Sequence, residues 1–159
     1  MKPKAYVETT VVSYLTAWRS RDLVRAAHQQ VTRDWWATRD SYDLFISQFV
    51  IDEAAAGDGL AASERLKVLR EIELLDVTED AIQLGQRLVA GGGLPPKARV
   101  DALHVAMAAV HGMSYLLTWN CKHIANAAMR IRIEQLCRDA GFEPPVICTP
   151  LELAEERVP

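Results

Sequence analysis

Short runs of apolar residues alternate along the chain with longer segments in which apolar residues recur at helical spacing. The short runs at 5–7, 44–46, 74–77, 115–118 and 146–148 predict five strands. The predicted helices cover 9–15, 22–38, 47 or 48 to 53, 63–72, 78–90, 98–111, and 120 or 122 to 137, and a last helix begins at Pro150. This alternation is typical of an α/β fold in which helices cover both faces of a parallel sheet.

No linker or internal repeat divides the chain. Its 159 residues, half of them hydrophobic, are enough for one domain with a sizeable core. Three glycines at 91–93, followed by Pro95 and Pro96, predict a helix end and a loop, and this loop leads directly into another predicted helix. We therefore expect a single domain over residues 1–159.

Composition narrows the function classes only a little. The net charge of −3 is unlike that of a uniformly basic nucleic-acid binder, so contact with RNA would need local basic patches or bound cations. No stretch is apolar enough to span a membrane, and Glu8 interrupts the first apolar run where a signal peptide would continue. Three cysteines without a CxxC pair favour reduced thiols and a cytoplasmic location.

Three acidic residues occupy positions where the surrounding sequence is apolar. Glu8 follows the first strand, Glu53 lies on a helix that is otherwise apolar apart from Asp52, and Asp101 lies near the start of an apolar helix. A buried carboxylate needs a cation, a hydrogen-bond network or a water-filled cleft. Ordinary alternatives exist for each, because Glu8 and Asp101 also suit helix N-termini and Glu53 also suits an exposed helix surface.

Asn120 follows the fourth strand in the same way as Glu8 follows the first. Ligands of parallel sheets lie beyond the carboxyl ends of the strands, although Asn at such a place also commonly caps the next helix. Several acids gathered there would repel one another unless a divalent cation neutralised them, and Mg²⁺ and Mn²⁺ favour oxygen ligands. A metal held by clustered carboxylates is suited to phosphodiester hydrolysis.

A weaker set of candidates could contact a nucleic-acid substrate. These residues are polar and lie beside the acids in the sequence: Thr9, Lys97, Arg99, Thr118 and Lys122. Solvated side chains and local ion pairs are the alternative for the charged members.

An Asp/His pair and a group of tryptophans are two further candidates, the first for a metal site and the second for a partner surface. Asp101 and His104, three residues apart on one helix, would suit zinc or iron only with a matching Glu-x-x-His elsewhere, which the sequence lacks, so His104 is expected to be a hydrogen-bonded neighbour of the site. Trp18, Trp35 and Trp36 are too many for one helix surface to bury, which indicates a partner surface.

Four segments together resemble a known family. Residues 6–15, with Glu-Thr-Thr at 8–10, resemble the opening strand and loop of PIN-domain proteins, and more narrowly a subgroup of bacterial VapC-type toxins. Residues 101–106 resemble the third acidic motif of the family, residues 116–120 the fourth, and Glu53 fits the second. The resemblance extends in the expected order to Val146.

The resemblance implies a three-layer α/β/α sandwich with a central parallel sheet. It implies a metal-dependent endoribonuclease, the toxin of a type II toxin–antitoxin system, in which a metal-activated water hydrolyses RNA. Glu8, Glu53 and Asp101, with Asn120 at the fourth position, would bind Mg²⁺ or Mn²⁺. The implied partners are RNA, a small antitoxin protein that blocks the acidic cleft, and a second copy of the chain in a homodimer.

The chain departs from the family pattern at two positions. PIN proteins usually have Asp where this chain has Glu8, and the fourth acidic position holds Asn120, which coordinates only through its carbonyl. These departures support the main alternative, a non-catalytic PIN-fold module that binds RNA or protein. A nuclease outside any toxin system is a third possibility.

Overall fold

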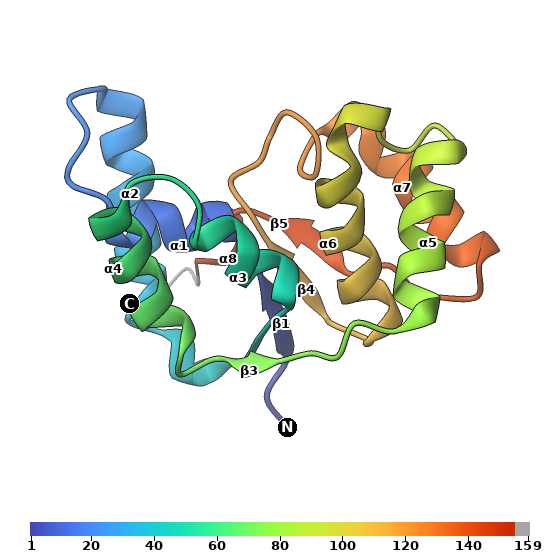
Figure 1. Ribbon diagram of the computed structural model, residues 1–159, viewed down its shortest axis with the longest axis horizontal. Helices are drawn as coiled ribbons and strands as arrows, with labels where there is room; N and C mark the ends of the chain where they lie inside the picture. Colours follow the sequence, from blue (N-terminus) through green and yellow to red (C-terminus); the bar gives the residue numbers. More distant parts are fainter. Residues whose placement is uncertain (155–159) are drawn as a thin grey trace, which may run out of the picture.

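A five-stranded sheet forms the centre of the computed structural model, which describes residues 1–154 (Figure 1). The predicted domain of residues 1–159 therefore extends over five residues that lie outside the described part. The strands are β1 (Lys4–Val7), β2 (Asp43–Ile46), β3 (Glu73–Leu74), β4 (Tyr115–Leu117) and β5 (Val146–Cys148).

All strand pairs in the sheet are parallel, in the order β3-β2-β1-β4-β5. The central strands β1 and β4 are mostly buried because helices cover the sheet, which is why their sequences are continuous apolar runs. The chain proceeds from β1 to β2 and β3 in one direction and then crosses back to β4 and β5. The strand order therefore reverses between β1 and β4.

Helices cover both sides of the sheet, which confirms the predicted three-layer α/β/α sandwich. Figure 1 shows α1, α2 and α4 on one side and α5, α6 and α7 on the other. The helices are α1 (Thr9–Thr16), α2 (Leu23–Trp36), α3 (Gln48–Ala54), α4 (Gly59–Leu69), α5 (Glu79–Ala90), α6 (Arg99–Val110), α7 (Ala127–Asp139) and α8 (Pro150–Leu153), with short 3₁₀ turns at Arg39–Ser41 and Pro96–Ala98.

Helix α6 is the most deeply buried helix of the described chain, with every residue from 102 to 109 inside. It packs against α5, whose buried residues Ala81, Leu84 and Leu88 recur at helical spacing. At the contact, a Cβ added to Gly85 would lie 2.9 Å from Cδ2 of Leu103, so the glycine permits the close approach.

Three predicted element boundaries are wrong. Asp58, rather than Ser63, caps α4, because its carboxylate accepts a hydrogen bond from Ala61 N at 3.0 Å. The third strand is limited to Glu73–Leu74. Helix α7 begins only at Ala127, with Asn126 as its cap, and the preceding residues form turns.

The predicted partner surface is wrong for Trp35, which is not at the surface. Trp35 is 2% exposed and belongs to the core, and Trp36 is partly buried beneath the guanidinium of Arg39. Trp18 is 97% exposed.

Within residues 1–154, no helix combines the length and apolarity that crossing a membrane requires.

Candidate metal centre

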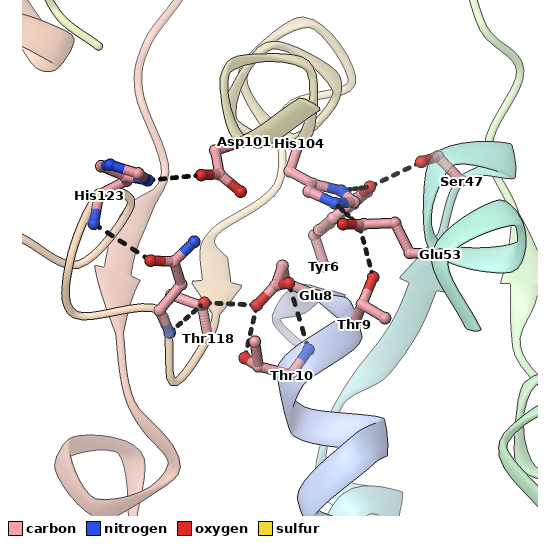
Figure 2. A network of polar contacts seen from close by, with 11 residues as sticks. Tyr6, Glu8, Thr9, Thr10, Ser47, Glu53, Asp101, His104, Thr118 and His123 are labelled. Atoms are coloured by element: carbon pink, nitrogen blue, oxygen red, sulfur yellow. Dashed lines mark hydrogen bonds and ion pairs between the residues drawn. The ribbon is translucent and has the colours of Figure 1, made fainter. Parts of the chain in front are cut away.

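Polar side chains gather at the carboxyl ends of β1 and β4, where the strand order reverses. Glu8 directly follows β1 and Thr118 directly follows β4, while Glu53 lies on α3 and Asp101 in the first turn of α6 (Figure 2). Open parallel sheets bind their ligands at such a switch point. The sheet topology thus brings residues that are far apart in the sequence to one edge.

Glu8 is buried, with 2% of its surface exposed, yet its carboxylate is well supplied with hydrogen bonds. Oε1 accepts from the hydroxyls of Thr10 and Thr118, both at 2.6 Å, and Oε2 accepts from Thr10 N at 3.2 Å. Glu8 is therefore the cap of α1, and neither Thr9 nor Thr10 caps it. The two threonine hydroxyls instead donate to Glu53 and Glu8.

Burial raises the pKa of Glu8 above its ordinary value. The charge of His104 and the hydrogen bonds from Thr10 and Thr118 lower this pKa, but they do not offset the desolvation. An ionised Glu8 is thus incompletely compensated by the protein alone. A bound cation would supply the missing positive charge, so the residues present fit a metal site.

Glu53 is more accessible, with 38% of its side chain exposed. Oε1 accepts from the Thr9 hydroxyl at 2.8 Å and from His104 Nε2 at 2.5 Å. Burial by itself raises the pKa of Glu53, but the hydrogen bond and charge of His104, together with Thr9, hold it below its ordinary value. The neighbouring Asp52 points away and pairs with Gln48 on the exposed surface.

Glu8, Glu53 and His104 form a compact group. Each offers one potential ligand atom, and these atoms lie within 4.8 Å of one another. Such spacing is compatible with a single cation between them. Among the described residues, this is the one group of its kind.

Asp101 lies at the edge of this group rather than within it. Its Oδ2 pairs with Nδ1 of His123 at 2.9 Å, and 18% of its side chain is exposed. Figure 2 shows Asp101 between His123 and His104, on the same side of the site as the α6 backbone. The third predicted carboxylate therefore lies outside the compact group and is tied to a loop residue.

Asn120 stabilises the turn after β4. Its Oδ1 accepts from His123 N at 3.1 Å, and its own N–H donates to the Thr118 hydroxyl at 2.9 Å. The side chain thus caps the turn at residues 120–123 rather than a helix. The carbonyl oxygen keeps a second lone pair.

The predicted substrate contacts divide into two kinds. Thr9 and Thr118 lie inside the site, where their hydroxyls donate to Glu53 and Glu8. Lys97, Arg99 and Lys122 are exposed near the start of α6 and in the turns after β4. The threonines therefore orient the carboxylates, while the three cations face solvent.

Tyr6, Ser47 and Thr10 contact the site but were not predicted to belong to it. Ser47 follows β2 just as Glu8 follows β1, so the rule that identified Glu8 would also have identified Ser47. The Tyr6 hydroxyl lies within an apolar strand, and no local pattern points to its partners.

The comparisons with known proteins identify both a family and a fold. The PIN domain family model matches residues 5–128, a segment that contains the acids and Asn120. The fold is similar to that of VapC20 from Mycobacterium tuberculosis, a toxin described as cleaving the Sarcin-Ricin loop. The TM-score is 0.61 at 15% identity, over 77% of this chain and 95% of that chain.

A second solved structure gives the same result. VapBC2 from Rickettsia felis, bound to a DNA fragment from its promoter, has a TM-score of 0.56 at 14% identity, over 92% of this chain and 98% of that chain. A comparison with curated protein sequences gave no significant match. At these identities, the solved structures establish the fold alone.

Proposed function

Because the chain belongs to the PIN-domain family, we propose that it is an endoribonuclease that requires Mg²⁺ or Mn²⁺ and acts as the toxin of a toxin–antitoxin pair in the cytoplasm. The observation that carries this proposal is the convergence of Glu8 and Glu53 at the point where the strand order reverses, with Asp101 beside them. Bringing carboxylates together in a partly buried place is costly, and a bound cation would offset that cost.

Glu8, Glu53 and Asp101 would hold the cation, and Asn120 could add its carbonyl oxygen. When bound, the cation would supply activation of the attacking water and neutralisation of the charge that develops on the phosphate. The threonines have a separate task, because Thr10 and Thr118 hold the Glu8 carboxylate and Thr9 holds that of Glu53. This second layer fixes the direction of each ligand oxygen.

RNA is the proposed substrate. VapC20, which shares the fold, is described as cleaving the Sarcin-Ricin loop, and PIN-domain nucleases of this type act on RNA. Lys97, Arg99 and Lys122 are exposed, in segments next to Asp101 and its partner His123, and would bind backbone phosphates of the RNA. Their positive charges offset, locally, the net charge of −3 of the whole chain.

Cleavage of mixed cellular RNA by the purified protein tests the proposal. We expect cleavage with Mg²⁺ or Mn²⁺ and none with excess EDTA. Asp101→Asn and Glu8→Gln should each reduce the rate about a hundredfold or more, since the cation contributes several kcal/mol to the transition state. Asp52→Asn is the matched control, because Asp52 neighbours Glu53 but faces solvent, and it should cleave like the wild type. Equal rates for all four proteins would refute the proposal.

The proposed partner is a small antitoxin protein, and the surface near α4 supports it. A groove of about 920 Å³ is lined by Trp18 and Leu60, which are 97% and 82% exposed, together with Arg19, Arg33 and Arg65. With Lys67, the basic residues of the lining outnumber the acids Asp58 and Glu64 by four to two, so the groove would suit an amphipathic segment with acidic side chains. Co-purification with the product of an adjacent gene tests this, and Trp18→Ser should weaken the complex. Purification of the chain alone from cells that express both genes would contradict it.

A non-catalytic module remains the second candidate, and one observation favours it. His123 engages Asp101 through its ring and Asn120 through its backbone N–H, so one loop residue holds two of the four motif residues. On this reading, the protein would bind RNA in the presence of Mn²⁺ without cleaving it. The cleavage assay above separates the two functions.

A further inference from the structure

A chain of hydrogen bonds leads from the core of the protein to the Glu53 carboxylate. The Ser47 and Tyr6 hydroxyl oxygens lie 2.6 Å apart, the Tyr6 hydroxyl lies 2.7 Å from His104 Nδ1, and His104 Nε2 lies 2.5 Å from Glu53 Oε1. Thr9 donates to the same Glu53 oxygen at 2.8 Å. Figure 2 shows the links in sequence.

The four residues linked by these hydrogen bonds come from separate helices and strands, and they differ in how far they are exposed to solvent. Tyr6 on β1, Ser47 at the end of β2 and His104 on α6 are fully buried, each with 0% of its surface exposed. Glu53 on α3 is the one member of the four that reaches the surface. The series of hydrogen bonds therefore connects the core to a carboxylate that solvent can reach.

The donors and acceptors match throughout the chain. A carboxylate only accepts hydrogen bonds, so His104 Nε2–H donates to Glu53 Oε1. The Tyr6 hydroxyl can both donate and accept, so its bond to Nδ1 is satisfied whether this ring nitrogen is bare or protonated. The Tyr6 and Ser47 hydroxyls share one further hydrogen bond, in which either of them can donate.

Both of these bonds to Glu53 go to the same oxygen. Thr9 and His104 hold Oε1, which leaves Oε2 available for another ligand. A glutamate at the surface of a helix of seven residues would otherwise sample several rotamers. The two donors restrict that freedom and fix the direction in which Oε2 points.

We propose that His104 is a positioning residue for the metal centre, which holds Glu53 in the orientation that binds the cation, with Tyr6 and Ser47 as its support. This inference rests on the proposed function in so far as Glu53 is a metal ligand. Residues that hydrogen-bond to ligating carboxylates typically contribute a factor of 10–100 to metal affinity. His104 acts through Glu53 rather than as a ligand, because both of its ring nitrogens already have partners.

Two amide substitutions separate the roles of the two ring nitrogens. The amide of Gln reaches roughly the position of Nε2 and that of Asn roughly the position of Nδ1, so His104→Gln keeps a donor to Glu53 and His104→Asn does not. Both variants remove the same ring from the same buried position. Any loss of stability should be similar for the two, and thermal unfolding measures it.

The decisive readout is the affinity for Mn²⁺, measured by electron paramagnetic resonance of the free ion in the absence of RNA. We expect His104→Asn to bind Mn²⁺ roughly ten- to a hundredfold more weakly than the wild type and His104→Gln to stay within a few-fold. Tyr6→Phe removes one supporting hydrogen bond and should weaken binding about two- to tenfold. Should His104→Asn fail to fold, Tyr6→Phe and His104→Gln decide the matter.

Four outcomes would overturn the inference. Two concern the variants: equal Mn²⁺ affinities of His104→Asn and His104→Gln, or an Mn²⁺ affinity of Tyr6→Phe equal to that of the wild type. Two concern the wild type: absence of saturable Mn²⁺ binding, or a ¹⁴N coupling to the bound ion that the substitution His104→Gln abolishes. The last of these would make His104 a direct ligand. Saturable Mn²⁺ binding without RNA cleavage by the wild type would refute the proposed ribonuclease and leave the positioning role intact.

Discussion

Glu8 combines two roles at one position. Its carboxylate caps α1 through Thr10 and also lies beside Glu53 and His104 in the compact group. The hydroxyl of Thr118, which follows β4, donates to the same carboxylate and so ties the two central strands together at the site. Substitution of Glu8 should therefore change both the free energy of unfolding and the affinity for a metal ion.

Stability of the metal-free protein should depend on the ionisation of Glu8. Burial holds the pKa of Glu8 above its ordinary value, so the folded protein retains a proton that the unfolded chain has lost. The free energy of unfolding therefore falls as pH rises from the ordinary glutamate pKa, about 4.3, through the raised pKa of the folded state. Urea denaturation in EDTA between about pH 4.5 and 8 measures this trend.

Glu8→Gln is the control for this prediction, since it removes the titration and keeps one carbonyl acceptor. Subtracting its curve removes the contributions of other groups, including Glu53, whose lowered pKa acts in the opposite direction. The difference, wild type minus variant, should decline with pH. A flat or rising difference would contradict the assignment of Glu8 as an undercompensated buried acid.

The three thiols should differ in reactivity. Burial raises the pKa of Cys137 to about 11 and that of Cys148 to about 12, whereas Cys121 is exposed. Because the thiolate is the reactive form, we expect Ellman's reagent at about pH 8 to label one thiol rapidly in the native protein and all three after denaturation. Cys121→Ser should abolish the rapid phase. Rapid labelling of two or more native thiols would contradict the burial described for α7 and β5.

At the scale of elements, α6 organises the site. Its burial from residue 102 to 109 fixes the helix against α5 and the sheet, so His104 has little freedom to move. Asp101, one turn earlier, lies at the exposed start of the same helix, where the helix dipole favours an acid. One rigid helix thereby presents a buried imidazole and an accessible carboxylate to the same edge of the sheet.

The start of α4 gives a prediction for a helix cap. Asp58 accepts from Ala61 N, whereas Ser63 lies within the helix on its exposed side. Asp58→Ala should therefore lower the free energy of unfolding by about 1 kcal/mol, and Ser63→Ala should change it by less than about 0.5 kcal/mol. Chemical denaturation measures both. A larger loss for Ser63→Ala would place the helix start five residues later than described.

At the scale of the whole molecule, the sequence predicts the strands and the parallel sheet better than it predicts contacts between side chains. Apolar runs predict all five strands and the parallel sheet, and the rule that ligands lie beyond strand ends brings Glu8 to the correct edge. Both inferences depend on patterns within short segments. The placement of Glu53 beside Glu8 follows from the family resemblance rather than from the pattern of its own helix.

Contacts between distant segments could not be predicted in this way. The chain from Ser47 through Tyr6 to His104 joins two strands and a helix, and no spacing in the sequence records their proximity. The delayed start of α7 has a similar origin, because Asn120 accepts from His123 N and holds a turn where helical periodicity alone predicts a helix. Side-chain competition for backbone groups decided that boundary.

The proposed homodimer gives a prediction for the particle in solution. Several apolar side chains are largely exposed on the single chain, among them Leu23 at 86% and Ile131 at 75%. Burial of such residues against a second copy would stabilise the assembly. Light scattering during size-exclusion chromatography should give twice the chain mass of 17.7 kDa. A mass of one chain at micromolar concentrations would contradict the dimer.

The central claim is that Glu8, Glu53 and Asp101 bind one divalent cation at the point where the strand order reverses. Anomalous scattering at the manganese edge, from a crystal of the protein soaked in Mn²⁺, tests it most directly. The account predicts a peak in contact with carboxylate oxygens of Glu8 and Glu53, within reach of Asp101, and no peak in crystals of Glu8→Gln. A wild-type crystal with manganese elsewhere, or with none at this edge of the sheet, would contradict it.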